Sequence, residues 1–282
     1  MARAKAAAPG AETRAVFGRV NYTAPMTERP RYHANDASRD VLVLDPRSIE
    51  VRDARGAAAP PSLEREGFAL FRHASAVANF RDAAEVRAMH APEIERLVAE
   101  LSGADRVVVS SPGVLRFGER SAESGRRSNS RPARFVHVDV SAPTAAAFAE
   151  RSRPRDDERP LRRFAHYNVW RVLTPPPQDV PLAVCDAGSV APEDLVPADA
   201  VFDEPGRPEW SFEGLVVRFN PAHRWFYYSG MAPDEALVFK TYDSDPGAPR
   251  QVPHSAFDDS TCPTGVPPRT SIEMRAIAYW LA

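Results

Sequence analysis

The sequence predicts a mainly β protein with helical additions, folded as a double-stranded β-helix (a jelly roll of the cupin type). About eight short apolar runs are separated by turn signals such as Asn220-Pro221 and Asp245-Pro246-Gly247. Most of these runs lie downstream of a region with helical periodicity. Regularly spaced short strands of this kind are typical of sandwiches and jelly rolls.

The length of the chain favours one large domain. With 282 residues the chain can bury a sizeable core. We expect a single domain at 16–282, with a mixed helical and β part at 16–105 and the jelly-roll core at 106–282. The Ala-rich segment 1–15 lacks an apolar pattern and is predicted to be disordered.

Composition limits the kinds of partner. The formal charge is −2, so there is no basic footprint for nucleic acid. Cys185 and Cys262 are far apart in sequence and indicate neither a disulfide framework nor structural zinc. No run of 18 apolar residues is present, and the N-terminus lacks a signal-peptide core. We therefore expect a cytoplasmic protein that binds a small molecule, with neither nucleic acid nor membrane as partner, and we leave a homodimer open.

The first part of the chain predicts short strands followed by two helices. Asp45-Pro46 indicates a turn between two strands, and 27–40 is polar and predicts a surface arm. Apolar residues recur at helical spacing between 79 and 101, where Pro92 opens the second helix and Gly103 ends it. The strands predicted here are 16–22, 41–44, 49–52 and 106–110, and segment 62–71 predicts a short helical piece followed by a strand.

The second part predicts a loop, one helix and the remaining strands. Segment 116–134 is rich in arginine and poor in apolar residues, which favours a solvated or mobile loop over a grip for an anionic substrate. Because this loop leads directly to His137, it is also a candidate lid. Segment 142–151 predicts a helix capped by Ser141 or Thr144. Further strands are predicted at 165–173, 182–186, 215–219, 224–229, 235–242 and 271–280.

The segment 135–139 contains the strongest indication of chemistry. His137 and Asp139 end an apolar run and are two residues apart, so on a strand they share a face. With a second histidine they would form the facial triad of non-haem Fe(II) oxygenases, whose expected fold is the double-stranded β-helix. His254 is the preferred third ligand, with His223 as its rival and His166 behind both. The alternative for His137 and Asp139 is a buried hydrogen-bonded pair.

The last predicted strand supplies a candidate site for the co-substrate. Arg269 lies 15 positions after His254 and begins an Arg-x-Ser pattern with Ser271. A guanidinium and a hydroxyl suit the distal carboxylate of 2-oxoglutarate, because arginine offers a bidentate fork. Arg275 competes for this role. Other polar residues that could orient ligands in an apolar pocket are Asn168 and Tyr228 for the co-substrate, and Arg171, His223 and Arg224 for catalysis or substrate.

Seven segments in order resemble the hydroxylase/desaturase family of fungal and bacterial secondary metabolism, which includes gibberellin-desaturase-like proteins and the cephamycin methoxylation component. The resemblance extends from about Val16 to the C-terminus. The chain departs from the family at Val140-Ser141, where a Thr is usual, and in its Arg-rich loop. The matching segments are 135–139, 167–171, 181–186, 223–228, 240–244, 253–257 and 268–273.

The resemblance implies an Fe(II)/2-oxoglutarate-dependent oxygenase that uses O2. It implies that His137, Asp139 and His254 bind iron and that Arg269 binds the co-substrate. The expected reaction is hydroxylation, desaturation or ring formation on a small-molecule secondary metabolite. Two alternatives stay open: a metal-dependent hydrolase or isomerase on the same fold, and a non-catalytic substrate-binding partner in a biosynthetic complex.

Overall fold

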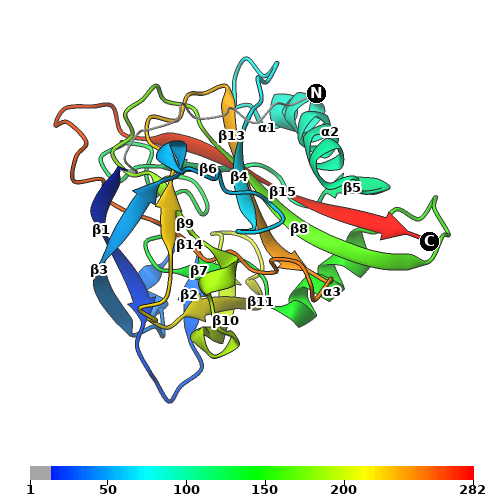
Figure 1. Ribbon diagram of the computed structural model, residues 1–282, viewed down its shortest axis with the longest axis horizontal. Coiled ribbons are helices and arrows are strands. Elements are labelled where there is room, and N and C mark those ends of the chain that lie inside the picture. The colour runs from blue at the N-terminus through cyan, green and yellow to red at the C-terminus, as the bar shows by residue number, and fades with distance from the viewer. Residues whose placement is uncertain (1–13) are drawn as a thin grey trace.

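The structure is a computed structural model that describes residues 14–282. Residues 1–13, most of the segment predicted to be disordered, lie outside the described residues, and Ala15 already belongs to a strand. The described strands form two sheets that enclose the candidate site (Figure 1). This agrees with the predicted jelly roll.

The larger sheet carries two of the predicted metal ligands. Its strand order is β1-β3-β12-β9-β14-β7-β11-β10-β2 among the described residues. In that order the strands are β1 (Ala15–Thr23), β3 (Leu44–Asp53), β12 (Trp225–Tyr227), β9 (Leu182–Cys185), β14 (His254–Ala256), β7 (His137–Val138), β11 (Trp210–Val217), β10 (Leu195–Phe202) and β2 (Arg31–His33).

The smaller sheet is built around one long antiparallel pair, β8 (Leu161–Val172) and β15 (Thr270–Leu281). β13 (Glu235–Asp243) and β4 (Phe68–Arg72) extend it beyond β8. β5 (Arg106–Val109) and β6 (Val114–Phe117) both pair with β15 on its other side. Strands from before and after residue 105 therefore share the same two sheets.

Alternation along β8 and β15 decides which side chains face the site. Trp170 and Val172 point inward and pack with Val184 of the larger sheet. Val169 and Met274 point outward and pack against α2 (Ala91–Ser102). Because Arg275 pairs with Asn168 in the register, these two polar side chains also belong to the inner face.

The helices cover the smaller sheet, but the two helices predicted between 79 and 101 form one continuous helical stretch. α1 (Ala83–Glu85) continues through a π-helical turn, Val86–His90, into α2, which has Pro92 in its first turn. Gly103 ends α2 with φ +64°, a left-handed conformation that glycine adopts without strain. α3 (Ala142–Ser152) is capped by Ser141, whose hydroxyl accepts a hydrogen bond from the Thr144 N–H. None of the helices in residues 14–282 is long and apolar enough to cross a membrane.

One prediction for the N-terminal part is wrong, and another is incomplete. Asp45-Pro46 is not a turn, because β3 runs straight through it, with Pro46 opposite Asn21 of β1. β12 pairs only with residues 51–53 of β3, so the segment around Pro46 has one open edge, where a strand tolerates proline. The polar arm at 27–40 contains β2, which pairs with β10. Both β2 and β10 were absent from the predicted strands.

Candidate metal centre

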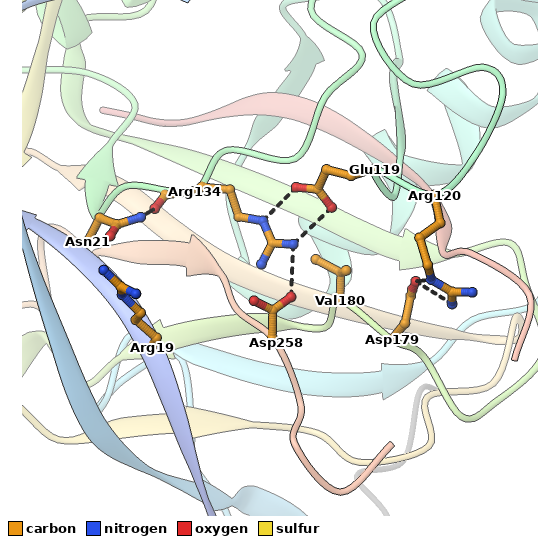
Figure 2. A pocket seen from close by; sticks show the side chains of 8 residues that line it. All are labelled: Arg19, Asn21, Glu119, Arg120, Arg134, Asp179, Val180 and Asp258. Atoms are coloured by element: carbon orange, nitrogen blue, oxygen red, sulfur yellow. Dashed lines mark hydrogen bonds and ion pairs between the residues drawn. The ribbon is translucent and has the colours of Figure 1, made fainter. Parts of the chain in front are cut away.

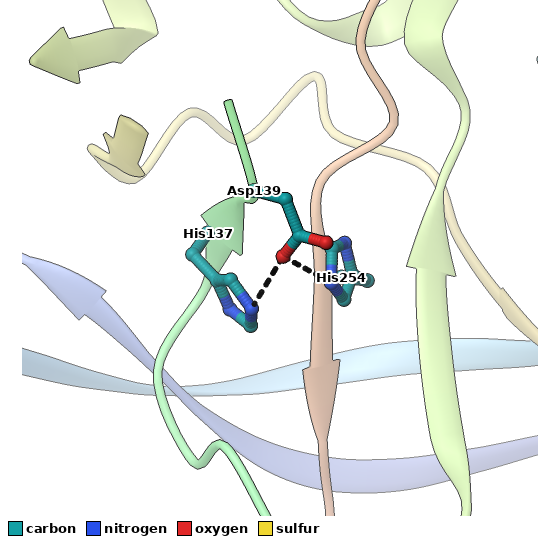
Figure 3. Close-up of side chains that lie close together, drawn as sticks. All are labelled: His137, Asp139 and His254. Atoms are coloured by element: carbon teal, nitrogen blue, oxygen red, sulfur yellow. Dashed lines mark ion pairs between the residues drawn. The ribbon is translucent and has the colours of Figure 1, made fainter. Parts of the chain in front are cut away.

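His137, Asp139 and His254 converge between the two sheets (Figure 3). β7 and β14 are neighbours, and His137 stands opposite His254 in their register, which brings residues 117 positions apart into contact. The Nε2 atoms of both histidines lie 3.6 Å from Asp139 Oδ1. All three side chains are buried.

Backbone carbonyls fix the orientation of both imidazoles. His137 Nδ1 donates to the Phe135 carbonyl at 3.0 Å, and His254 Nδ1 donates to the Val252 carbonyl at 3.2 Å. In this tautomer each Nε2 carries a free lone pair directed at the space beside Asp139. Burial, together with the nearby His254, lowers the pKa of His137 to about 3, so its ring is neutral. Neutral imidazole is the form that binds metal.

The smaller sheet holds the other oxygen of Asp139. Its Oδ2 accepts hydrogen bonds from Asn168 Nδ2 at 2.8 Å and Arg275 Nε at 2.9 Å. Burial alone would raise the pKa of Asp139, but the nearby Arg275 guanidinium brings this pKa well below its ordinary value. The aspartate is therefore a carboxylate with Oδ2 occupied and Oδ1 available. Asn168, predicted to orient the co-substrate, instead contacts this carboxylate.

The donor set fits a six-coordinate divalent metal. Ligands on adjacent corners of an octahedron with bonds of about 2.1 Å lie about 3 Å apart, close to the 3.6 Å between each Nε2 and Oδ1. Two imidazole nitrogens and one carboxylate oxygen on one side leave three corners free. This set is the one non-haem Fe(II) oxygenases use.

Arg269 and Ser271 lie on the inner face of the smaller sheet, at the N-terminal end of β15, and Arg275 follows on the same strand. Arg269 is 1% exposed, and its guanidinium lies 5.5 Å from the ring centre of Trp170. Within residues 14–282 it forms no ion pair, and both Arg269 Nε and Ser271 Oγ are buried without a hydrogen-bond partner. Burial and the nearby cations Arg116 and Arg134 lower the pKa of Arg269 to about 9. Unpartnered donors of this kind fit a bound carboxylate.

The structure does not bring Arg171, His223 and Arg224 to this cluster. Arg171 points to the outer face of β8, where it contacts His73 and the Phe80 ring. His223 uses both ring nitrogens elsewhere, on Tyr22 Oη at 3.0 Å and Asp194 Oδ2 at 3.1 Å.

Arg224, the third of these, forms an ion pair with Asp186 at 2.7 Å. Tyr228, predicted to contact the co-substrate, packs in the apolar cluster that contains Trp170. The Tyr228 hydroxyl forms a hydrogen bond with the backbone of Leu70, and burial raises the pKa of this hydroxyl.

A cavity of about 430 Å³ opens beside the triad and includes His137, Asp139 and Arg275 in its wall. The Arg-rich segment contributes Arg116, Asn129 and residues 131–134 to the same wall. This segment therefore lies where a lid would lie. The predicted surface arm also reaches the cavity, through 32–35.

A second pocket is lined mainly by charged side chains, among them Glu119, Arg120 and Asp179 (Figure 2). Arg134 bridges Glu119 and Asp258 there, at 2.6 and 2.9 Å, and Arg120 pairs with Asp179 at 2.8 Å. Asp179 also accepts the backbone N–H of Arg269 at 2.9 Å. The acidic groups of this pocket are thus already bound to arginines or to backbone.

Sequence reasoning missed two site residues and misassigned a third. Arg275 was considered only as a rival of Arg269, although its period-two spacing from Arg269 already placed both on one face. Arg116 was assigned to a solvated loop because segment 116–134 is poor in apolar residues, yet it belongs to the four-residue strand β6. Tyr32 lies in a polar segment that gave no strand signal, yet it lines the cavity.

Comparison with known proteins places this geometry in a family. A family described as an oxidoreductase/YMDC permease-like domain matches residues 20–279. The chain is 31% identical over 240 residues to an Fe(II)/2-oxoglutarate-dependent dioxygenase, nvfI, of Aspergillus novofumigatus, covering 83% of this chain and 84% of that protein. It is also 31% identical over 255 residues to the hydroxylase/desaturase CTB9 of Cercospora beticola, covering 83% and 76%.

A solved structure agrees over nearly the whole chain. It is described as the iron and alpha-ketoglutarate-dependent endoperoxidase NvfI with different conformation, and it superposes with a TM-score of 0.83 at 26% identity. The match covers 97% of this chain and 100% of that one. The fold, the His-Asp-His cluster and the sequence similarity agree. This chain therefore belongs to the family of Fe(II)/2-oxoglutarate-dependent oxygenases that contains these dioxygenases and hydroxylase/desaturases.

Proposed function

We propose that this chain oxidises a small-molecule secondary metabolite at an iron held by His137, Asp139 and His254. The observation that carries the proposal is the convergence of these three side chains, with every competing hydrogen-bonding atom of the cluster already satisfied. Both Nδ1 atoms are bound to carbonyls, and Asp139 Oδ2 is bound to Asn168 and Arg275. The atoms that stay available are His137 Nε2, His254 Nε2 and Asp139 Oδ1, and these can serve as ligand atoms for a metal.

We further propose that Arg269 and Ser271 hold the distal carboxylate of 2-oxoglutarate. Both have buried polar atoms without a partner, and Arg269 carries a buried charge that no carboxylate of the described chain neutralises. An uncompensated guanidinium is costly to bury, so a ligand anion would offset that cost. Trp170 under the guanidinium restricts its orientation.

Each protein group has a separate task in this arrangement. When bound, Fe(II) and 2-oxoglutarate supply the capacity to activate O2 and oxidise a C–H bond. Arg275 and Asn168 keep Asp139 ionised and in one rotamer, and the carbonyls of Phe135 and Val252 keep the imidazoles neutral and aimed. Apolar side chains such as Phe135, Phe202 and Phe212 line part of the cavity next to the metal ligands, where a bound substrate would displace water.

The test is anaerobic addition of Fe(II) and 2-oxoglutarate to the purified protein. A weak visible absorption band from charge transfer between metal and co-substrate is expected in the wild type and should be absent in His137→Ala. A band of equal strength in the variant would remove His137 from the ligand set. Absence of a band in the wild type, with metal bound, would instead favour a hydrolase or isomerase on this fold.

A further inference from the structure

The wall of the catalytic cavity carries a positive charge that no carboxylate of the described chain neutralises. Arg116 is half-buried on β6 and lines the same cavity as His137 and Asp139. Its Nη1 donates only to uncharged oxygens: the Asn129 carbonyl at 3.2 Å, Asn129 Oδ1 at 3.0 Å and the Arg131 carbonyl at 2.7 Å. Within residues 14–282, no acidic side chain lies within ion-pair distance of it.

The sheet register directs this charge inward. Arg116 stands opposite Ser271 in the β6–β15 pair, so both side chains leave the same face of the sheet. The wall contains three other arginines: Arg275 is bound to Asp139 and Glu273 at 2.9 Å each, Arg134 is bound to Glu119 and Asp258, and Arg131 is exposed to solvent. Among the described residues, Arg116 is therefore the half-buried arginine of the wall that has no acidic partner.

Apolar side chains form part of the remaining wall. It includes Phe135, Phe202 and Phe212, together with Leu42, Leu44 and Val201. A ligand with an apolar skeleton can pack against these side chains, and an anionic group on it would be attracted to the half-buried Arg116. Arginine suits a carboxylate best, because its planar fork donates two parallel hydrogen bonds.

We propose that Arg116 binds a carboxylate carried by an otherwise apolar substrate and thereby positions the substrate skeleton beside His137 and Asp139. This inference rests on the proposed function, since it takes the 430 Å³ cavity to be the substrate pocket. The carboxylates of 2-oxoglutarate offer the same chemistry from another source. Arg269 and Ser271 already provide donors for that molecule, so the substrate is the source we assign to Arg116.

The experiment compares two probes that differ only in charge, naphthalene-2-carboxylate and naphthalene-2-carboxamide. Each is titrated by calorimetry into the full chain saturated with Mn(II) and 2-oxoglutarate, and separately into the metal-free chain. The wild type is expected to bind the carboxylate about 10- to 100-fold more tightly than the amide, as a charge-assisted bidentate contact would produce. Arg116→Gln should abolish this preference, and Arg116→Lys should retain part of it.

The control is Arg126→Gln, which removes the same charge from an exposed position of the same loop and should leave the preference intact. Because Arg116 also ties the loop to Asn129 and Arg131, circular dichroism must show that each variant is folded, and Arg116→Lys provides the test if the Gln variant is not. Equal binding of both probes by the wild type, or an unchanged preference in Arg116→Gln, overturns the proposal.

Titration of 2-oxoglutarate separates the two sources of carboxylate. Arg116→Gln should leave the affinity for 2-oxoglutarate within about twofold of wild type. If this variant loses 2-oxoglutarate binding while probe binding is unchanged, Arg116 serves the co-substrate and our assignment is overturned. Failure of the wild type to bind metal or 2-oxoglutarate would count against the proposed function alone, because the metal-free titration still tests Arg116.

Discussion

Asp139 divides its two oxygens between the two sheets. Oδ2 is held by Asn168 and Arg275 of the smaller sheet, while Oδ1 faces His137 and His254 of the larger one. A buried carboxylate without partners would take up a proton and lose its affinity for a cation. The arginine thus has a metal-related role even though it does not contact the metal position. A displaced hydrogen-bond partner of Asp139 would therefore disturb the contacts that this residue makes with both sheets.

The two rival histidines should behave oppositely when replaced. His254→Ala should abolish stoichiometric metal binding, because one of three ligands is lost. His223→Ala should retain the metal but lower the free energy of unfolding by about 1–3 kcal/mol, since Tyr22 and Asp194 lose a buried partner. Metal content after dialysis and urea unfolding measure the two effects. Loss of metal in His223→Ala with retention in His254→Ala would move the third ligand.

Arg269 offers a prediction in which affinity and stability change in different directions. Arg269→Met should weaken 2-oxoglutarate binding by about 10- to 100-fold, because the carboxylate loses a charge-assisted fork. The same variant should be as stable as the wild type or more stable without ligand, since it removes a buried charge without an ion pair. Calorimetric titration and thermal unfolding measure the two quantities.

The metal itself provides the internal control for Arg269→Met. The affinity of the variant for the metal should stay unchanged, because no contact between Arg269 and His137, Asp139 or His254 is present among the described residues. Loss of metal together with a large drop in melting temperature would show that Arg269 is a structural residue.

At the scale of elements, the sequence was most informative where a pattern repeats. β15 was predicted because Ile272, Met274, Ala276 and Ala278 alternate, and that alternation also placed Arg269 and Ser271 on the opposite face. β14 has only three residues and exists because β7 and β9 pair with it on either side. Pairing of this kind is invisible in one segment alone. β3 is the reverse case: Asp45-Pro46 predicts a turn, but pairing with β1 keeps this segment extended.

Gly214 of β11 shows how an element positions a ligand. A Cβ at this residue would lie 3.0 Å from the Asp139 carbonyl oxygen and 2.9 Å from Tyr32 Oη. Gly214→Ala should therefore displace the backbone of Asp139 and weaken metal binding by about 10- to 100-fold, an effect typical of supporting residues. Competition with a chelator measures it. Gly247→Ala is the matched control, because its Cβ would make only one 3.4 Å contact; equal metal affinity in the two variants would show that the strand can yield.

At the scale of the whole molecule, the site depends on both sheets keeping their separation. Metal ligands come from β7, β14 and the residue after β7, and their supporting partners come from β8 and β15. α3 packs by Ala149 against Ile277 and Tyr279 near the end of β15. The same helix receives a hydrogen bond from His166 of β8, whose Nε2 donates to the Ala145 carbonyl at 2.9 Å. Helix, sheet and site are therefore stabilised together.

Buried neutral histidines should make the whole fold sensitive to acid. Burial lowers the pKa of His166 to about 4 and that of His90 to about 4. An unfolded histidine takes up its proton near pH 6.5, so between pH 6.5 and 4 the unfolded state binds more protons and is favoured as the pH falls. For His166 alone this difference of about 2.5 in pKa corresponds to about 3 kcal/mol in the free energy of unfolding. That contribution is fully present above pH 6.5 and is lost as the pH falls toward 4.

His166→Gln tests this contribution, because glutamine can donate to the Ala145 carbonyl but does not titrate. The variant should lose stability less steeply than the wild type as the pH falls from 6.5 to 4, as measured by urea unfolding at several pH values. Tyr279→Phe is the matched control, since it removes a hydrogen bond of the same kind, from Tyr279 Oη to the Ala149 carbonyl of α3 at 2.9 Å, without removing a group that titrates in acid. It should lower stability by a similar amount at every pH and keep the wild-type slope. A wild-type slope in His166→Gln would mean that this histidine is protonated in the folded protein at its ordinary pKa, and the acid sensitivity would have to come from His90 and the other buried groups.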